Sequence, residues 1–258
     1  MRSSAMAALL LMCCGQCAGA GDLKPATVAA FDRYIHQTEE RLNARKTFLW
    51  ADESPDRSRR VREGAVVVEP AGPKPVTDVT GGLIHDWVGA VFVPGISLAA
   101  TLEHVRDYDR ARTLHHEVMD SRIVSHNGND YRVYMRLLKK KVITVVLNTE
   151  HDIHYFPIDA THWRSQSKTT KIAEVEDVGK PGEHELPPGT GHGFLWRLDT
   201  YWRFEERDGG TWIECEAISL TRDIPTGLGW LIEPIIRSLP KESLENTLRE
   251  TAAALSRK

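Results

Sequence analysis

The apolar residues of this chain recur with a period of two between residues 118 and 222, and no other feature limits the fold as strongly. Alternating apolar and polar side chains are typical of β-strands that bury one face. The pattern predicts strands at 118–126, 130–138, 142–156, 161–175, 193–206 and 211–222. Turn residues separate them, and Asp208-Gly209 is a hairpin signal between the last two. Such short connections predict one antiparallel sheet.

Helices flank this region. A strand at 83–93 and a helical segment at 97–116 come before it, and a helix with Pro240 in its first turn closes the chain. The closing helix has an apolar stripe formed by Leu244, Leu248, Thr251, Ala252 and Leu255. A single amphipathic helix must bury its stripe, and one face of the sheet is the available partner. The predicted fold class is therefore α+β: a curved antiparallel sheet of about six to seven strands gripping a long C-terminal helix, with space for a ligand between them.

The first residues have the pattern of an export signal. Arg2 and an apolar run from Ala5 to Cys14 precede Ala18-Gly19-Ala20, which is the pattern of a signal-peptidase site. We therefore predict that residues 1–20 are a signal peptide and that the mature chain is exported, to the periplasm or the medium. The alternative is a lipoprotein signal, in which Cys13, Cys14 or Cys17 carries the lipid. No later segment has the roughly 18 apolar residues of a membrane helix, so no span is predicted in the mature chain.

Residues 21–80 are predicted to form an N-terminal extension. They contain an amphipathic helix at 25–46, a polar stretch at 51–63 and a short strand at 65–68. This segment is too small to bury a core alone, so we expect it to pack on the main domain, residues 81–258. The basic runs Arg57, Arg59, Arg60, Arg62 and Lys139-Lys140-Lys141 are predicted to be solvated loops. The formal net charge of −3 argues against a nucleic-acid partner.

The order of the elements resembles that of a known superfamily. Val91-Phe92-Val93-Pro94 leads into helices, and the segment from Gly229-Trp230-Leu231 to Leu255 ends the chain. In these respects residues 81 to 257 resemble the START-like helix-grip superfamily, which includes lipid-transfer domains, polyketide cyclases and aromatases. The resemblance involves no catalytic motif. It implies a hydrophobic ligand in the cavity and leaves the identity of that ligand open.

The Asp208-Gly209 hairpin predicts which residues face the cavity. It places Trp202 opposite Cys215 and Thr200 opposite Ala217. The predicted ligand pocket consists of Trp196, Leu198, Thr200, Trp202, Phe204, Ile213, Cys215, Ala217 and Ser219, with Ser167 as a hydroxyl on another strand beside Ser165 and Thr169. An ordinary filled core and an exposed polar strand face are the competing interpretations. The opposite face pairs Arg203 with Glu214 and Tyr201 with Glu216, and it is predicted to be exposed to solvent.

No motif for catalysis, for a cofactor or for a metal stands out. His151 and His154 are three apart on a predicted strand and would point to opposite faces, so no metal site is predicted. Cys215 lies outside any catalytic signature and is interpreted as a small apolar residue.

Three functions remain compatible with the sequence. The leading hypothesis is a protein that binds or carries an apolar small molecule, such as a lipid, a quinone-like compound or an aromatic compound. The second is an enzyme of the cyclase or aromatase kind, with Arg136 or Tyr134 as the first candidates for moving protons. The third is a structural or interaction module with a filled core. The sequence does not determine the oligomeric state.

Overall fold

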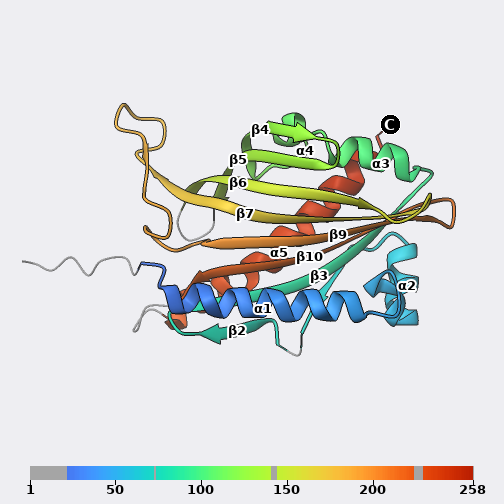
Figure 1. The fold of residues 1–258 in the computed structure, drawn as a ribbon, viewed down its shortest axis with the longest axis horizontal. Helices are drawn as coiled ribbons and strands as arrows, with labels where there is room; N and C mark the ends of the chain where they lie inside the picture. Colours follow the sequence, from blue (N-terminus) through green and yellow to red (C-terminus); the bar gives the residue numbers. More distant parts are fainter. Residues whose placement is uncertain (1–21, 73, 141–143, 224–228, 258) are drawn as a thin grey trace, which may run out of the picture.

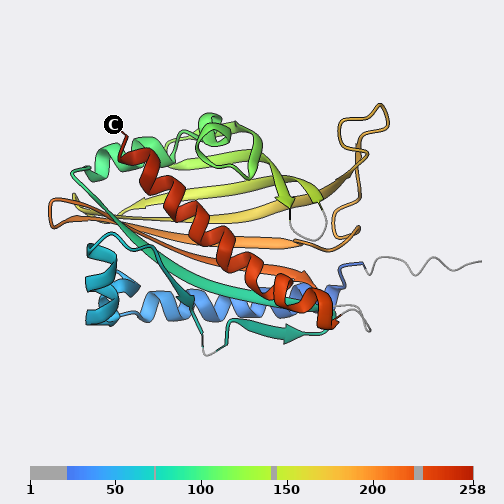
Figure 2. The ribbon, with the colours of Figure 1, turned by 180° about the vertical axis from the view of Figure 1, so that it is seen from behind.

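The computed structural model describes residues 22–72, 74–140, 144–223 and 229–257. The signal peptide predicted for residues 1–20, with its three cysteines, and Lys141 of the second basic run lie outside the described residues. The described chain forms one antiparallel sheet with helices on both of its faces (Figures 1 and 2).

The sheet has ten strands in the described part of the chain, more than the six to seven predicted. Along it the order is β1-β3-β10-β9-β7-β6-β5-β4, while β2 pairs with β3 and β8 pairs with β7. Their bounds are β1 (Val67–Pro70), β2 (Val76–Val79), β3 (Gly82–Pro94), β4 (Val118–Asn127), β5 (Asp130–Lys140), β6 (Thr144–Pro157), β7 (His162–Glu176), β8 (His184–Glu185), β9 (Arg197–Arg207) and β10 (Gly210–Arg222). Of the three short strands, β1 overlaps the strand predicted at 65–68, whereas β2 and β8 were not predicted because their few residues show too little alternation.

Helix α5 (Gly229–Leu255) crosses one face of the sheet diagonally (Figure 2). We call this face the inner face. Leu244, Leu248 and Leu255 of the predicted stripe are buried in the main core, beside Trp87 and Val91 of β3. The predicted fold class, a curved antiparallel sheet gripping a long C-terminal helix, is thus confirmed. The predicted start of the helix is wrong, because α5 begins at Gly229 and Pro240 lies inside it.

The hairpin register predicted from Asp208-Gly209 is confirmed. Strands β9 and β10 pair Arg207 with Gly210, Trp202 with Cys215 and Thr200 with Ala217. Asp208 and Gly209 both have positive φ, as the two-residue turn requires. Because side chains alternate along a strand, this register fixes which residues of β9 and β10 face α5.

The other face, called here the outer face, is not exposed as predicted. Helix α1 (Pro25–Ala44) lies over its β3–β10 part (Figure 1), with Phe31 and Ile35 packed on Ile84 and Ile218 of the sheet. The exposed fractions of Glu214 and Glu216 are 2% and 1%. Arg41 and Arg45 of the N-terminal segment form ion pairs with these carboxylates. The prediction was wrong because the pairing of β9 with β10 does not reveal that a helix packs on them.

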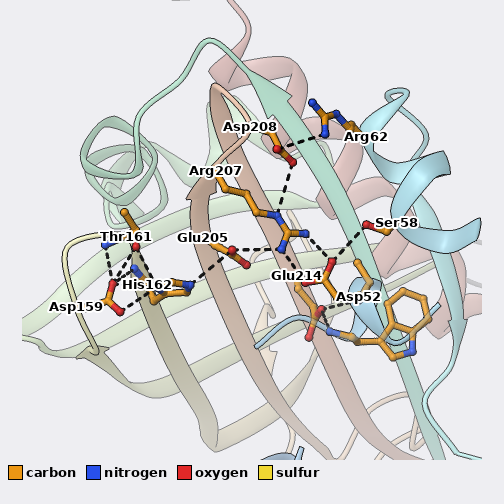
Figure 3. A network of polar contacts seen from close by, with 12 residues as sticks. Asp52, Ser58, Arg62, Asp159, Thr161, His162, Glu205, Arg207, Asp208 and Glu214 are labelled. Carbon is orange, nitrogen blue, oxygen red and sulfur yellow. Dashed lines mark hydrogen bonds and ion pairs between the residues drawn. The ribbon is translucent and has the colours of Figure 1, made fainter. Parts of the chain in front are cut away.

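A second polar network joins the N-terminal segment to the end of the β9–β10 hairpin (Figure 3). Arg207 donates two hydrogen bonds to Asp52, at 2.8 and 2.6 Å, and a third to Glu205. Arg62 lies 3.3 Å from Asp208. Asp52 belongs to the 3-10 helix η1 (Trp50–Glu53), so this turn is held against the sheet by charged hydrogen bonds.

The two basic runs are not loops. Arg57, Arg59, Arg60 and Arg62 lie in helix α2 (Pro55–Arg62), which Ser54 caps and Pro55 begins. Lys139 and Lys140 lie at the end of β5, and Lys139 pairs with Glu117. The prediction relied on like charges repelling one another, but acidic neighbours offset that repulsion here; Arg59, for example, contacts both Asp56 and Glu63.

Candidate ligand-binding cavity

The inner face of the sheet, α5 and the segment from α3 to α4 border a cavity of about 770 Å³. That segment comprises α3 (Leu98–Val105), the 3-10 helix η2 (Tyr108–Arg110) and α4 (Ala111–Leu114), within the helical segment predicted at 97–116. The wall is mainly apolar, including Met135, Leu137, Ile153, Tyr155, Trp202 and Phe204 from the sheet and Leu239 and Leu244 from α5.

Eight of the ten predicted pocket residues border this cavity: Ser167, Leu198, Thr200, Trp202, Phe204, Cys215, Ala217 and Ser219. Their common orientation follows from the β9–β10 register and from the pairing of Ser167 with Thr200. Trp202 stacks almost parallel to Phe204, with an interplanar angle of 4°. The two rings are therefore parallel, with their centroids 6.1 Å apart.

The other two predicted residues lie elsewhere. Ile213 is fully buried in the main core. Trp196 precedes the first residue of β9, so the alternation that orients Leu198 and Thr200 does not extend to it. Its ring packs with Phe31 and Ile218 in the cluster under α1.

Burial affects the chemistry of Cys215. Its thiol is 1% exposed, and burial raises its pKa well above the ordinary value, with Glu216 and Glu214 adding to the rise. The thiol is therefore protonated and unreactive at neutral pH. This agrees with its interpretation as a small apolar residue.

Hydroxyl groups form a polar strip on the otherwise apolar wall. Ser165, Ser167, Thr200 and Ser219 border the cavity from three neighbouring strands. Thr169 continues the same face of β7, but its hydroxyl accepts the backbone N–H of Leu198 at 3.0 Å. The competing interpretation of Ser165, Ser167 and Thr169 as an exposed polar face is not supported, because all three are buried.

His151 is one of the cavity residues that the sequence interpretation missed. It lies on β6 with Ile153 and Tyr155, all facing inward, and its exposed fraction is 6%. Burial lowers the pKa of its imidazole to about 4, against a small opposing effect of Asp152. The ring is therefore neutral at physiological pH. The available signal was the period of two, which places His151 on the same side as Ile153 and Tyr155.

The residues that directly follow α4 form polar contacts with α5 and with β5. Glu250 of α5 contacts His116 and lies 3.3 Å from His115, just after α4. Glu117 contacts Lys139 and accepts a hydrogen bond from Ser243 of α5 at 2.7 Å. These contacts connect the helices with the sheet edge.

One buried carboxylate organises a loop that borders the cavity. Glu174 of β7 accepts the backbone N–H groups of His192 at 2.8 Å and Gly193 at 2.9 Å. It also contacts Nδ1 of His192 at 2.9 Å. Since His192, Gly193 and Phe194 border the cavity, Glu174 positions part of its wall.

The residues suspected of cyclase chemistry lie outside. Met135 and Leu137 of β5 border the cavity, so the intervening Arg136 points away from it. Arg136 bonds Glu183 and Tyr134 bonds Asn148, both at 2.9 Å. Neither side chain can reach a molecule in the cavity.

Among the described residues, no group of three His, Cys, Asp or Glu side chains is arranged to hold a metal ion. His154 is exposed and pairs with Asp130, away from His151. Within the described part of the chain no helix is long and apolar enough to cross a membrane.

Comparison with known proteins gives similarity of structure alone. No family model matches the chain, and no curated protein matches it. A solved protein from Thermus thermophilus is similar with a TM-score of 0.48 and 13% identity, over 65% of this chain and 94% of that one. A STAR-related lipid transfer protein from Xanthomonas axonopodis is similar with a TM-score of 0.46 and 14% identity, over 72% of this chain and 100% of that one.

The Zhui aromatase/cyclase from a Streptomyces species has a TM-score of 0.43 and 12% identity, over 67% of this chain and 94% of its own. These similarities concern the order and arrangement of helices and strands.

Proposed function

We propose that this protein binds an apolar small molecule in the cavity between the inner face of its sheet and α5, and that it acts as a carrier. The observation that supports this most directly is the cavity itself, about 770 Å³ in volume with a mainly apolar wall. Pockets that enclose drug-sized ligands typically measure roughly 300–1,000 Å³ and have such walls with a few polar groups. A structural module would be expected to fill this space with side chains.

The arrangement of the wall fits a partly aromatic or polycyclic ligand. The indole of Trp202 offers a flat apolar surface to the cavity, and the small residues Cys215 and Ala217 lie nearby on β10. Small side chains next to large rings leave volume that a rigid ligand can occupy. The hydroxyl strip would then contact the ligand's polar part.

The sequence adds a location to this proposal. The pattern of residues 1–20 supports export, and a carrier outside the cytoplasm would move apolar molecules through water between membranes or to a receptor. N-terminal sequencing of protein recovered from outside the cytoplasm would test this part, with Gly21 expected as the first residue.

Native mass spectrometry of the protein from its producing host, followed by solvent extraction, tests the carrier proposal. We expect a discrete excess mass that is released as an apolar compound. Ala217→Trp should abolish it, because the indole would fill the space beside Trp202. Val124→Trp is the matched control, since Val124 is 50% exposed and does not border the cavity.

A wild-type mass without ligand, still unchanged after incubation with phospholipids and quinones, would contradict the carrier proposal. Equal ligand content in Ala217→Trp and wild type would place the ligand outside the cavity and contradict it as well. Both variants need thermal unfolding curves to establish that they fold.

A further inference from the structure

We infer that His151 is a hydrogen-bond acceptor for the ligand and that the cavity therefore selects apolar molecules carrying a hydroxyl group. This inference rests on the proposed function and specifies the chemical class of its ligand. It follows from the hydrogen bonds around the imidazole, which determine which ring nitrogen carries the proton.

The hydroxyl of Thr149 fixes the tautomer. Thr149 Oγ1 donates its one proton to the backbone carbonyl of Met135 at 3.0 Å. The same oxygen lies 2.9 Å from Nε2 of His151. Since the hydroxyl proton is already used, Thr149 can only accept from the ring, and Nε2 must carry the hydrogen. In the neutral ring Nδ1 then has a free lone pair.

The lone pair of Nδ1 faces accessible space. Nδ1 has no hydrogen-bond partner among the described residues, and it is not one of the unpartnered polar atoms that are sealed in the interior. His151 borders the cavity, so the accessible space beside its ring is the cavity. The arrangement offers an acceptor in an apolar wall, where a hydrogen bond is stronger than in water.

The backbone next to His151 is also irregular. The pairing of β6 with β7 is shifted between Glu150 and His151, so that Glu150 pairs with Lys171 and His151 pairs with Thr169. Thr170 is the extra residue of this bulge. Bulges reorient side chains and are frequent beside functional sites.

The acceptor determines the ligand class. A phenol, enol or alcohol can donate to Nδ1, whereas an ether or a hydrocarbon cannot. An ionised carboxylate offers only lone pairs and would be repelled at this position. Burial keeps the imidazole uncharged at neutral pH by lowering its pKa, so it would not attract an anion either. The inference thus distinguishes hydroxylated apolar molecules from fatty-acid anions.

The test uses two probes of nearly equal size, 2-naphthol and 2-methoxynaphthalene, with binding measured by fluorescence and calorimetry. We expect the wild-type protein to bind 2-naphthol about tenfold more tightly, as one buried hydrogen bond allows. His151→Leu should reduce the ratio to about one, since the acceptor is then gone. In that variant Thr149 still donates to Met135, so no buried donor loses its partner.

Two further variants separate a specific role from a structural one. His151→Asn should restore part of the preference, because its side-chain oxygen can lie near the position of Nδ1. His154→Leu is the matched control on the same strand: His154 is exposed, bonds Asp130, and should leave the ratio unchanged. The ¹⁵N resonance of Nδ1 in wild-type His151 should shift with 2-naphthol and not with 2-methoxynaphthalene.

The outcomes separate the two proposals. If both probes bind and His151→Leu keeps the tenfold ratio, the acceptor role is wrong and the carrier function stands. If both probes bind the wild type equally, the inference also fails without affecting the carrier function. If neither probe binds the wild type while its fold is intact, the inference fails, and the native mass measurement described above decides the proposed function separately.

Discussion

Arg45 Nη1 lies 2.6 Å from Oε1 of Glu214, and the two side chains are 5% and 3% exposed. This ion pair joins the end of α1 to the outer face of the sheet. Glu214 also accepts the backbone N–H of Trp50, so it binds both the helix end and the turn that follows it. The N-terminal segment is thereby attached to the middle of β10 by a buried charge.

Arg45→Met tests the energetic importance of this attachment. The variant leaves the Glu214 carboxylate buried without its guanidinium, and removing one partner of a buried pair typically lowers stability by about 3–5 kcal/mol. We expect a loss of that size in the free energy of unfolding by urea at pH 7. Arg132→Met is the matched control, because Arg132 and Asp152 are each 50% exposed and such pairs contribute about 0–1 kcal/mol. Similar losses in the two variants would contradict the assignment.

Gly89→Ala tests how closely α5 crosses the sheet. A Cβ at Gly89 would lie 2.7 Å from Leu248 Cδ1 and 2.8 Å from Val68 Cγ2. Overpacking of this kind costs about 1–3 kcal/mol, which we expect to see in urea unfolding. At Gly72 a Cβ would meet no atom closer than 3.8 Å, so Gly72→Ala should change the stability by less than about 1 kcal/mol. An unaffected Gly89→Ala protein would mean that α5 does not need this close approach.

Asp199 predicts a pH dependence of stability. Burial raises its pKa from 3.8 to about 7, although Lys168 opposes the rise. A raised pKa means that the folded state binds more protons than the unfolded state between these two values. Stability contributed by this group is therefore complete below about pH 4 and is lost as the pH rises through about 7.

The measurement compares wild type with Asp199→Asn from pH 4 to pH 8. The difference in the free energy of unfolding, wild type minus variant, should fall by on the order of 2–4 kcal/mol as the pH rises. The control, Asp120→Asn, replaces a carboxylate that is 50% exposed. It should change the free energy of unfolding by less than about 0.5 kcal/mol at both pH 4 and pH 8. If the difference in the free energy of unfolding between wild type and Asp199→Asn does not change with pH, the Asp199 carboxyl is not protonated in the folded protein.

Much of the inner face could be predicted from the sequence because one local signal controls it. The turn at Asp208-Gly209 fixes the register, and the period of two then assigns Leu198, Trp202 and Ala217 to one face. The same rule places His151 beside Thr149 on one strand, but the hydrogen bond from Thr149 to the carbonyl of Met135 depends on how β5 pairs with β6. Such a contact between strands has no signature in the residue pattern.

The outer face could not be predicted from the strands alone. Arg45 lies 169 positions before Glu214, and Arg41 lies 175 positions before Glu216. A charged strand face looks the same in the sequence whether water or a helix covers it. Trp196 illustrates another limit, because alternation orients a side chain only inside a strand, and β9 begins one residue later.

Strand β10 belongs to two different environments at once. Cys215 and Ala217 face the cavity, while Glu214 and Glu216 face the cations of the N-terminal segment. Adjacent residues of one strand therefore meet different structural requirements. The outward carboxylates are needed to hold the N-terminal segment, whereas under the proposed function the inward side chains set the size of the cavity, so tolerance to substitution should rise and fall with every second residue.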